Sequence, residues 1–117
     1  MPSFPFSQAL TANQTGFNPI DNWQYDRVPL SWPMGALVRI IVRATGVSAR
    51  ISIFTGSDNV VQRSPVQSGG TAGVTPSVLN TTPFEFRAAP GDRLLPLIDE
   101  VGGVTPTVDG IVEINPL

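Results

Sequence analysis

The sequence predicts an all-β fold, an antiparallel sandwich of two sheets with about eight strands, of jelly-roll or another Greek-key type. Short segments in which apolar and polar residues alternate recur along the chain and indicate strands. The 117 residues include 11 Gly and 12 Pro without a collagen-like period, which is typical of many turns between short elements. No segment has a helical repeat long enough to compete, and the length fits a single domain, 1–117.

The clearest strand is 36–44, ALVRIIVRA, because Val38, Ile40 and Val42 fall on one face of it. The alternation resumes at 49–55, ARISIFT, after a short Gly-containing turn. We therefore expect the two segments to pair as an antiparallel hairpin.

Further strands are expected where the alternation, or a short apolar run, returns between turn residues. These segments are 60–63 (VVQR), 84–88 (FEFRA), 93–98 (RLLPLI) and 108–114 (VDGIVEI). Pro96 interrupts RLLPLI, and proline cannot donate a hydrogen bond to a neighbouring strand. That segment is therefore predicted to be an edge strand or a bulged strand.

Two further segments are rich in turn residues, and the second of them is long for a loop within a small domain. The first, about 1–22, is an extended N-terminal arm in which Phe4 and Phe6 alternate around Pro5. Because such an arm cannot bury two Phe rings by itself, it either covers the core of its own domain or reaches a neighbouring subunit. The second, about 64–82, is rich in Gly, Ser, Thr and Pro and is expected to be a functional loop, either flexible or ordered by a partner.

Aromatic residues are concentrated in the segment 22–35, NWQYDRVPLSWPMG, which contains Trp23, Tyr25 and Trp32. Aromatic rings with a polar edge favour half-buried positions and interfaces. The segment is therefore either a strand that covers one end of the sandwich or a contact surface for a partner or a sugar ring.

Residue types that carry much of enzyme chemistry are absent from the chain. It contains no His and no Cys, and all seven basic residues are Arg. The commonest general base, thiol nucleophiles, thiolate metal ligands and lysine chemistry are therefore excluded. We expect no catalytic activity, no cofactor and no metal site.

Four acidic residues lie near successive turns: Asp92, Asp99, Glu100 and Asp109. They lack the spacing of a calcium-binding loop, and the adjacent Asp99 and Glu100 would point to opposite faces of a strand. Asp is also frequent in turns because its side chain bonds to the local backbone. We interpret 89–103 as a turn, a strand and a turn, in which Arg93, Asp99 and Glu100 are candidates for contacts between subunits.

The net charge of −2 and the pI of about 4.8 leave the domain without a basic footprint for nucleic acid. Arg39, Arg43 and Arg50 are expected to be solvated or to pair with acidic residues of another subunit. The longest apolar stretch is interrupted by Arg39 and is too short to span a membrane. The N-terminal residues lack the pattern of a secretory signal, so we expect an unprocessed chain.

The FPF arm, the long Gly/Ser/Thr loop and the ending PTVDGIVEINPL resemble the small jelly-roll structural proteins of viruses and bacteriophages. The resemblance is spread over the chain rather than concentrated in one motif. It implies a capsid, decoration or spike-base subunit that is located in the virion and functions through assembly. It carries over no catalytic residue and no cofactor.

Two functions from different classes follow. The first is a virion structural protein that forms a homo-oligomer, a trimer or a pentamer, and contacts other virion proteins, with Phe4, Phe6 and the loop 64–82 at contacts. The second is a carbohydrate- or receptor-binding sandwich that exposes Trp23, Tyr25 and Trp32 as a platform.

Overall fold

The computed structural model describes residues 3–21, 23–56, 58–69, 71–76 and 81–117. It contains eight strands and, among these residues, no helix: β1 (Ser3–Ala9), β2 (Ala36–Ala44), β3 (Ala49–Thr55), β4 (Asp58–Pro65), β5 (Gln67–Ser68), β6 (Phe84–Ala88), β7 (Leu94–Glu100) and β8 (Thr107–Pro116). The all-β prediction is therefore confirmed, and the strands predicted at 36–44, 49–55 and 84–88 have the bounds that the structure gives them. No described segment forms a helix that is long and apolar enough to cross a membrane.

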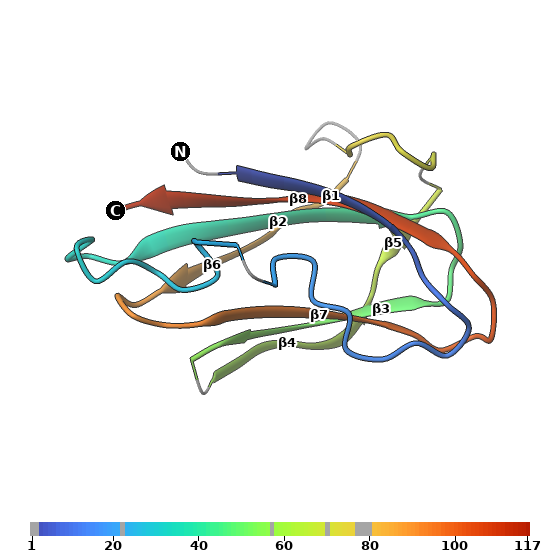
Figure 1. Ribbon diagram of the computed structural model, residues 1–117, viewed down its shortest axis with the longest axis horizontal. Helices are drawn as coiled ribbons and strands as arrows, with labels where there is room; N and C mark the ends of the chain where they lie inside the picture. Colours follow the sequence, from blue (N-terminus) through green and yellow to red (C-terminus); the bar gives the residue numbers. More distant parts are fainter. Residues whose placement is uncertain (1–2, 22, 57, 70, 77–80) are drawn as a thin grey trace.

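The strands form two sheets that lie one above the other in an elongated sandwich of 42 × 28 × 21 Å (Figure 1). The first sheet has the order β1-β8-β2, and the far side of β2 is shared by β6 and β5. β6 pairs antiparallel with Ala36–Ile40, and the short β5 pairs parallel with Arg43 and Ala44. The second sheet has the order β4-β3-β7 and is antiparallel throughout.

The predicted hairpin between 36–44 and 49–55 is wrong, because β2 and β3 belong to different sheets. β2 pairs with β8 along all nine residues, while β3 lies between β4 and β7. Alternation along two consecutive strands fits a hairpin within one sheet, and it fits equally well a chain that turns from one sheet to the other. In this protein the apolar faces of β2 and β3 are on opposite sides of the core instead of side by side.

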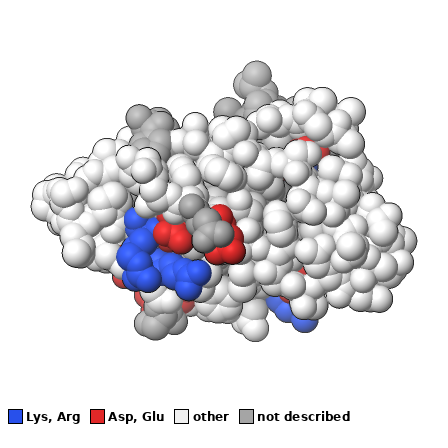
Figure 2. Space-filling view, viewed as in Figure 1, with Lys and Arg blue, Asp and Glu red and all other residues white. Residues whose placement is uncertain are grey.

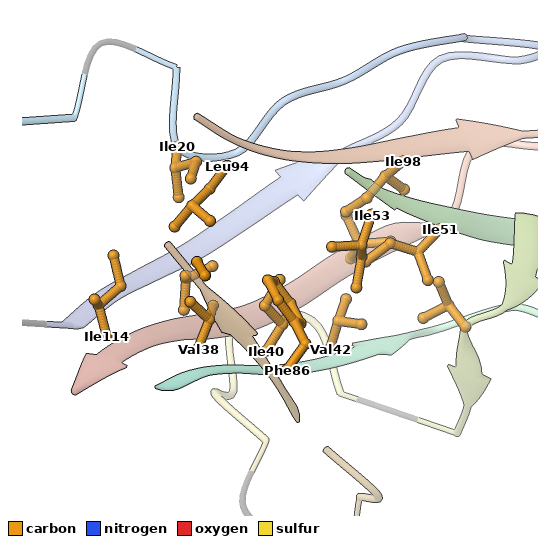
Figure 3. Close-up of a cluster of buried hydrophobic side chains, with 14 of the residues drawn as sticks. Ile20, Val38, Ile40, Val42, Ile51, Ile53, Phe86, Leu94, Ile98 and Ile114 are labelled. Atoms are coloured by element: carbon orange, nitrogen blue, oxygen red, sulfur yellow. The ribbon is translucent and has the colours of Figure 1, made fainter. Parts of the chain in front are cut away.

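The hydrophobic core fills the space between the sheets (Figure 3). Val38, Ile40 and Val42 come from the first sheet and Ile51 and Ile53 from the second, and each is at most 2% exposed. Burial of a side chain of this size contributes about 1.5–3 kcal/mol to stability. The inward face predicted for 36–44 is thus the face that builds the core.

β7 is an edge strand, as Pro96 predicts, and the segment between β1 and β2 covers its outer edge. The β7 amides of Leu94, Ile98 and Glu100 donate to the carbonyls of Asp26, Phe17 and Gln14 at 2.7–2.8 Å. Every second residue of β7 points its backbone amide toward the outer edge. Between Leu94 and Ile98 this residue is Pro96, which has no N–H to donate. The covering segment can therefore turn away from β7 at this point without leaving a donor unpaired.

The aromatic-rich segment 23–35 consists of turns and one isolated bridge, between Arg27 and Arg93, rather than a strand. Of the long loop predicted at 64–82, the first residues belong to β4 and β5. The part at 71–76 passes over the outer face of the first sheet, where the Gly73 amide donates to Asp109 Oδ1 at 3.1 Å and Asp109 is buried. Residues 70 and 77–80 of the loop lie outside the described part of the chain.

Candidate assembly surfaces

Glu100 ends β7 and is 1% exposed, on the buried face that it shares with Leu94 and Ile98. Its carboxylate accepts hydrogen bonds from the backbone amides of Asn13 (2.6 Å), Gly102 (2.7 Å) and Gly103 (2.9 Å). These bonds connect the end of β7 to the 11–16 loop on one side and to its own following turn on the other. The side chain is therefore engaged within its own chain.

The same contacts lower the pKa of Glu100 from 4.5 to about 2. The Asn13 amide has the largest effect because it donates to the charged form, and burial of the carboxylate opposes it. The Ser48 hydroxyl, which lies near the carboxylate, also lowers the pKa of Glu100. Its Oγ is buried, and its geometry to the described residues falls short of a hydrogen bond. Glu100 is thus a stabilised anion, which is the opposite of the raised pKa that a general acid needs at neutral pH.

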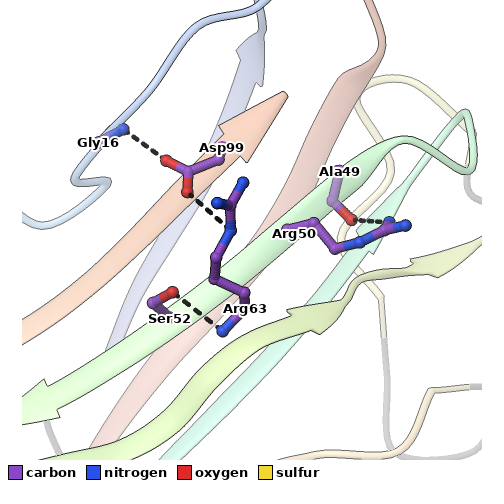
Figure 4. Close-up of polar contacts among 6 residues, drawn as sticks. All are labelled: Gly16, Ala49, Arg50, Ser52, Arg63 and Asp99. Atoms are coloured by element: carbon purple, nitrogen blue, oxygen red, sulfur yellow. Dashed lines mark hydrogen bonds and ion pairs between the residues drawn. The ribbon is translucent and has the colours of Figure 1, made fainter. Parts of the chain in front are cut away.

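Asp99 points to the other face of β7, as the strand interpretation predicts, and also bonds within the chain (Figure 4). Its Oδ1 accepts from the Gly16 amide at 2.7 Å, and its Oδ2 lies 3.9 Å from Arg63 Nε. Arg63 is in turn held by its own amide, which donates to Ser52 Oγ at 3.1 Å. Asp99 and Glu100 thus fix the 11–16 loop to the second sheet from the two faces of β7.

Arg93, the third candidate from this stretch, lies at the opposite end of β7 from Glu100. Its carbonyl accepts from the Gly56 amide, and its backbone bridges to Arg27. The structure therefore does not bring Arg93 together with Asp99 and Glu100 in one site. Within the described ranges, no three acidic side chains gather closely enough to hold a metal ion.

The aromatic candidates form one continuous row of ring contacts. Phe4 of β1 packs against Trp23 at 5.3 Å, Trp23 against Tyr25 at 5.4 Å, and Tyr25 against Trp32 at 5.9 Å. All four rings are half-buried and pack against the hydrophobic core. Their planes are inclined at 43°, 66° and 22°, so the rings contact one another and do not share one flat plane.

A pocket of about 570 Å³ lies where β5 and β6 of the first sheet face the end of β4. Its wall is mainly apolar and includes Val42, Val66 and Phe84. No charged side chain of the described residues lines it. The wall also includes Gln67, Ser68 and Thr82, so the pocket combines apolar walls with a few polar groups.

Six of the eight large exposed apolar side chains of the described residues belong to segments at the two ends of the long axis, which we call the first tip and the second tip (Figure 1); the other two are Val60 and Val74. The first tip consists of Leu30, Met34 and Leu117, and the Leu117 amide donates to the Gly35 carbonyl there. The second tip consists of Val47, Val101 and Val104. Leu30 and Met34 are 80% and 74% exposed, which is unusual for side chains of this size.

Two arginines border the tips: Arg50 Nη1 donates to the Val47 carbonyl at 3.1 Å, and Arg27 Nη1 donates to the carbonyl of Gly91, which adjoins Leu30. On the face shown in Figure 2 the main group of charges lies toward the middle, and both ends of the long axis are uncharged. Arg39 pairs with Glu85 at 3.1 Å on the outer face of the first sheet, with Glu113 4.0 Å away on the other side.

Sequence reasoning missed the tips. The available signal was single apolar residues next to Pro or Gly in turns, such as Pro29-Leu30 and Pro33-Met34-Gly35.

Comparison of the chain with protein-family models, with curated proteins and with solved structures finds no match.

Proposed function

We propose that this protein is a structural subunit of a virus or bacteriophage particle, a capsid, decoration or minor coat protein with a sandwich of jelly-roll type. It acts through association with further copies of itself and with other virion proteins. The observation that carries the proposal is the exposure of large apolar side chains in segments at opposite ends of the sandwich. Exposed apolar patches on a folded domain mark interaction surfaces, and each tip is proposed to be such a patch.

The chemistry of the described residues supports a role in assembly over one in catalysis. The buried carboxylate of Glu100 is occupied by backbone amides, and the apolar pocket has no charged wall. Two surfaces at opposite ends allow each subunit to contact one neighbour at each end. Such contacts produce rings or extended lattices, as a trimer, a pentamer or a shell requires.

The first tip provides a direct test. The double substitution Leu30→Ser and Met34→Ser removes two exposed apolar side chains that make no contribution to the core. We expect the apparent dissociation constant of the oligomer to rise at least about tenfold, because about 1.4 kcal/mol of lost binding energy corresponds to a factor of ten. Light scattering coupled to size-exclusion chromatography over a concentration series measures this change.

The matched control is Val60→Ser, which removes an exposed apolar side chain on β4, away from both tips. It should leave the dissociation constant unchanged, and all variants should retain the thermal midpoint of the native protein. A native chain that remains a monodisperse monomer at high micromolar concentration would contradict the proposed function.

A further inference from the structure

The two sheets have four outer edges, and three of them are protected against pairing with another strand. The edge of β7 is covered by the segment that bonds to its amides. β4 shifts register twice against β3, carries Asp58 and Arg63, and ends at Pro65. The far edge of the first sheet is divided between β6, which carries Glu85 and Arg87, and the two-residue β5. Irregularity, charge, short length and coverage are the usual defences of edge strands.

β1 has none of these four defences, and its one protective residue is Pro5. Its seven residues, SFPFSQA, pair with β8 without a register shift and include no charged side chain. Ser3, Pro5, Ser7 and Ala9 are all exposed. The outer edge of β1 is therefore a regular, uncharged and accessible ladder.

The hydrogen bond just beyond the last β1–β8 pair shows which β1 residues point their backbone N–H and C=O groups toward β8 and which point them away. The Leu10 amide donates to the Pro106 carbonyl at 2.8 Å, and this pair continues the β1–β8 register by one step. Because directions alternate along a strand, even-numbered residues bond to β8 and odd-numbered residues point their N–H and C=O groups away from it. No described residue accepts a hydrogen bond from the amides of Ser3, Ser7 or Ala9.

We infer that β1 pairs with β1 of a second copy of this chain, antiparallel and about a twofold axis at Ser7. This inference rests on the proposed function and names one of its contacts. In this register Ser7 lies opposite Ser7 of the copy, and Pro5 lies opposite Ala9. Two equivalent bonds join the Ser7 residues, and the Ala9 amide of each chain donates to the Pro5 carbonyl of the other.

The one bond that this register cannot form is already accounted for within each chain. Pro5 has no amide to donate to the Ala9 carbonyl opposite it. That carbonyl accepts instead from Gln8 Nε2 of its own chain at 3.0 Å. Donors and acceptors of the edge are thus complementary to those of an identical edge, which selects a second copy as the partner.

Side chains also fit this pairing. The exposed side chains of the outer face, at positions 3, 5, 7 and 9, are small and uncharged, so they neither clash nor repel across the axis. On the inner face, Gln8 of one chain lies opposite Phe6 of the other and covers part of that half-buried ring. The dimer continues the first sheet across the axis and leaves both tips available for other contacts.

A proline substitution tests the pairing at its centre. Ser7→Pro removes the two central bonds but no bond to β8, and we expect it to raise the dissociation constant of the dimer at least about tenfold. Ser3→Pro is the matched control. It removes another outward-pointing amide of β1, and this amide takes part in none of the four proposed bonds between the two chains. It should leave the dissociation constant unchanged in analytical ultracentrifugation.

A cysteine crosslink gives a second, independent readout. The chain contains no Cys, so a single introduced thiol can form a disulfide only between chains. Directly opposed Ser7 residues would have Cα atoms about 5.5 Å apart, which suits a disulfide. Ser7→Cys should therefore give a covalent dimer under mild oxidation, whereas Ser3→Cys, with thiols roughly 26 Å apart, should not.

These outcomes separate the inference from the proposed function. If Ser7→Pro associates like the native chain and Ser7→Cys forms no more dimer than Ser3→Cys, strand pairing is wrong, while assembly through the tips stands. A native chain that is monomeric in every assay contradicts both. If Ser7→Pro fails to fold, the comparison of the two cysteine variants decides.

Discussion

Glu100, a candidate for a contact between subunits, has a structural role within its own chain. Its carboxylate is surrounded by backbone amides from two loops, so its negative charge is compensated without any basic side chain. The following Gly102 and Gly103 expose their amides to it, and the space at Gly102 is already filled by Ser48. The Gly-Gly pair after β7 thus forms a turn that is anchored to the Glu100 carboxylate.

The lowered pKa predicts a specific dependence of stability on pH. Because the pKa of Glu100 is about 2 in the folded state and 4.5 without the fold, its contribution to stability is fully present above about pH 5 and is lost as the pH falls toward about 2. Glu100→Gln should therefore unfold at lower urea concentration than the native chain at pH 7. The difference between the two proteins should shrink progressively between about pH 5 and pH 2.

Glu85→Gln is the control, since it changes an exposed carboxylate in a surface ion pair. It should shift the urea midpoint little at any pH, because such pairs contribute about 0–1 kcal/mol. A constant difference between Glu100→Gln and the native chain down to pH 2 would show that the ionised carboxylate is not what stabilises the fold.

At the scale of elements, β1 is joined to the sandwich through the contact of Phe6 with Gly110 of β8. A side chain at position 110 would lie 2.6 Å from Phe6 Cζ and 2.6 Å from the Ile41 carbonyl oxygen. The glycine thus leaves room for the Phe6 ring against β8, close to the Ile41 carbonyl of β2. The N-terminal arm covers its own core in this way, so Phe4 and Phe6 contact the same chain from which they come.

Gly110→Ala should accordingly loosen β1. The added methyl group meets backbone on one side and an aromatic ring on the other, and overpacking of this kind costs about 1–3 kcal/mol. We expect a loss of about 2 kcal/mol in urea unfolding and faster hydrogen exchange of the β1 amides. Gly46→Ala is the control: the new Cβ would lie at an ordinary 3.5 Å from Pro106, and stability should stay within about 0.5 kcal/mol.

Local pattern predicted the strands well because alternation is a property of the strand itself. β2, β3 and β6 begin and end where the sequence predicts, and Pro96 correctly indicates an edge. The pairing of β2 with β3 was predicted wrongly because pairing is a relation between segments. A short turn such as 45–48 joins two strands of one sheet or of two sheets with the same residues.

At the scale of the whole molecule, the exposed apolar side chains of the tips predict how association responds to temperature and salt. Apolar contacts are little screened by salt and weaken on cooling, whereas exposed ion pairs weaken as the Debye length falls to about 3 Å in 1 M salt. We expect the oligomer to persist from about 0.05 to 1 M NaCl. It should shift toward monomer on cooling to about 5 °C.

Sedimentation velocity at fixed protein concentration measures both responses. Dissociation by salt at constant temperature would indicate that ion pairs, rather than the tips and the β1 edge, hold the subunits together. Ammonium sulfate at the same ionic strength should strengthen association, because it favours burial of apolar surface.

The sequence by itself determined the fold class, most strand positions and the absence of His, Cys and Lys chemistry, because these depend on composition and on local periodicity. Only the tertiary structure decided that β2 and β3 face each other, that the Glu100 carboxylate meets amides of the 11–16 loop, and that most of the large exposed apolar side chains lie at two tips. Each of these outcomes depends on segments distant in the chain, such as Asn13 and Glu100, meeting in space. The physical reason is that burial and hydrogen-bond partners belong to the assembled sheets, whereas alternation belongs to one strand alone.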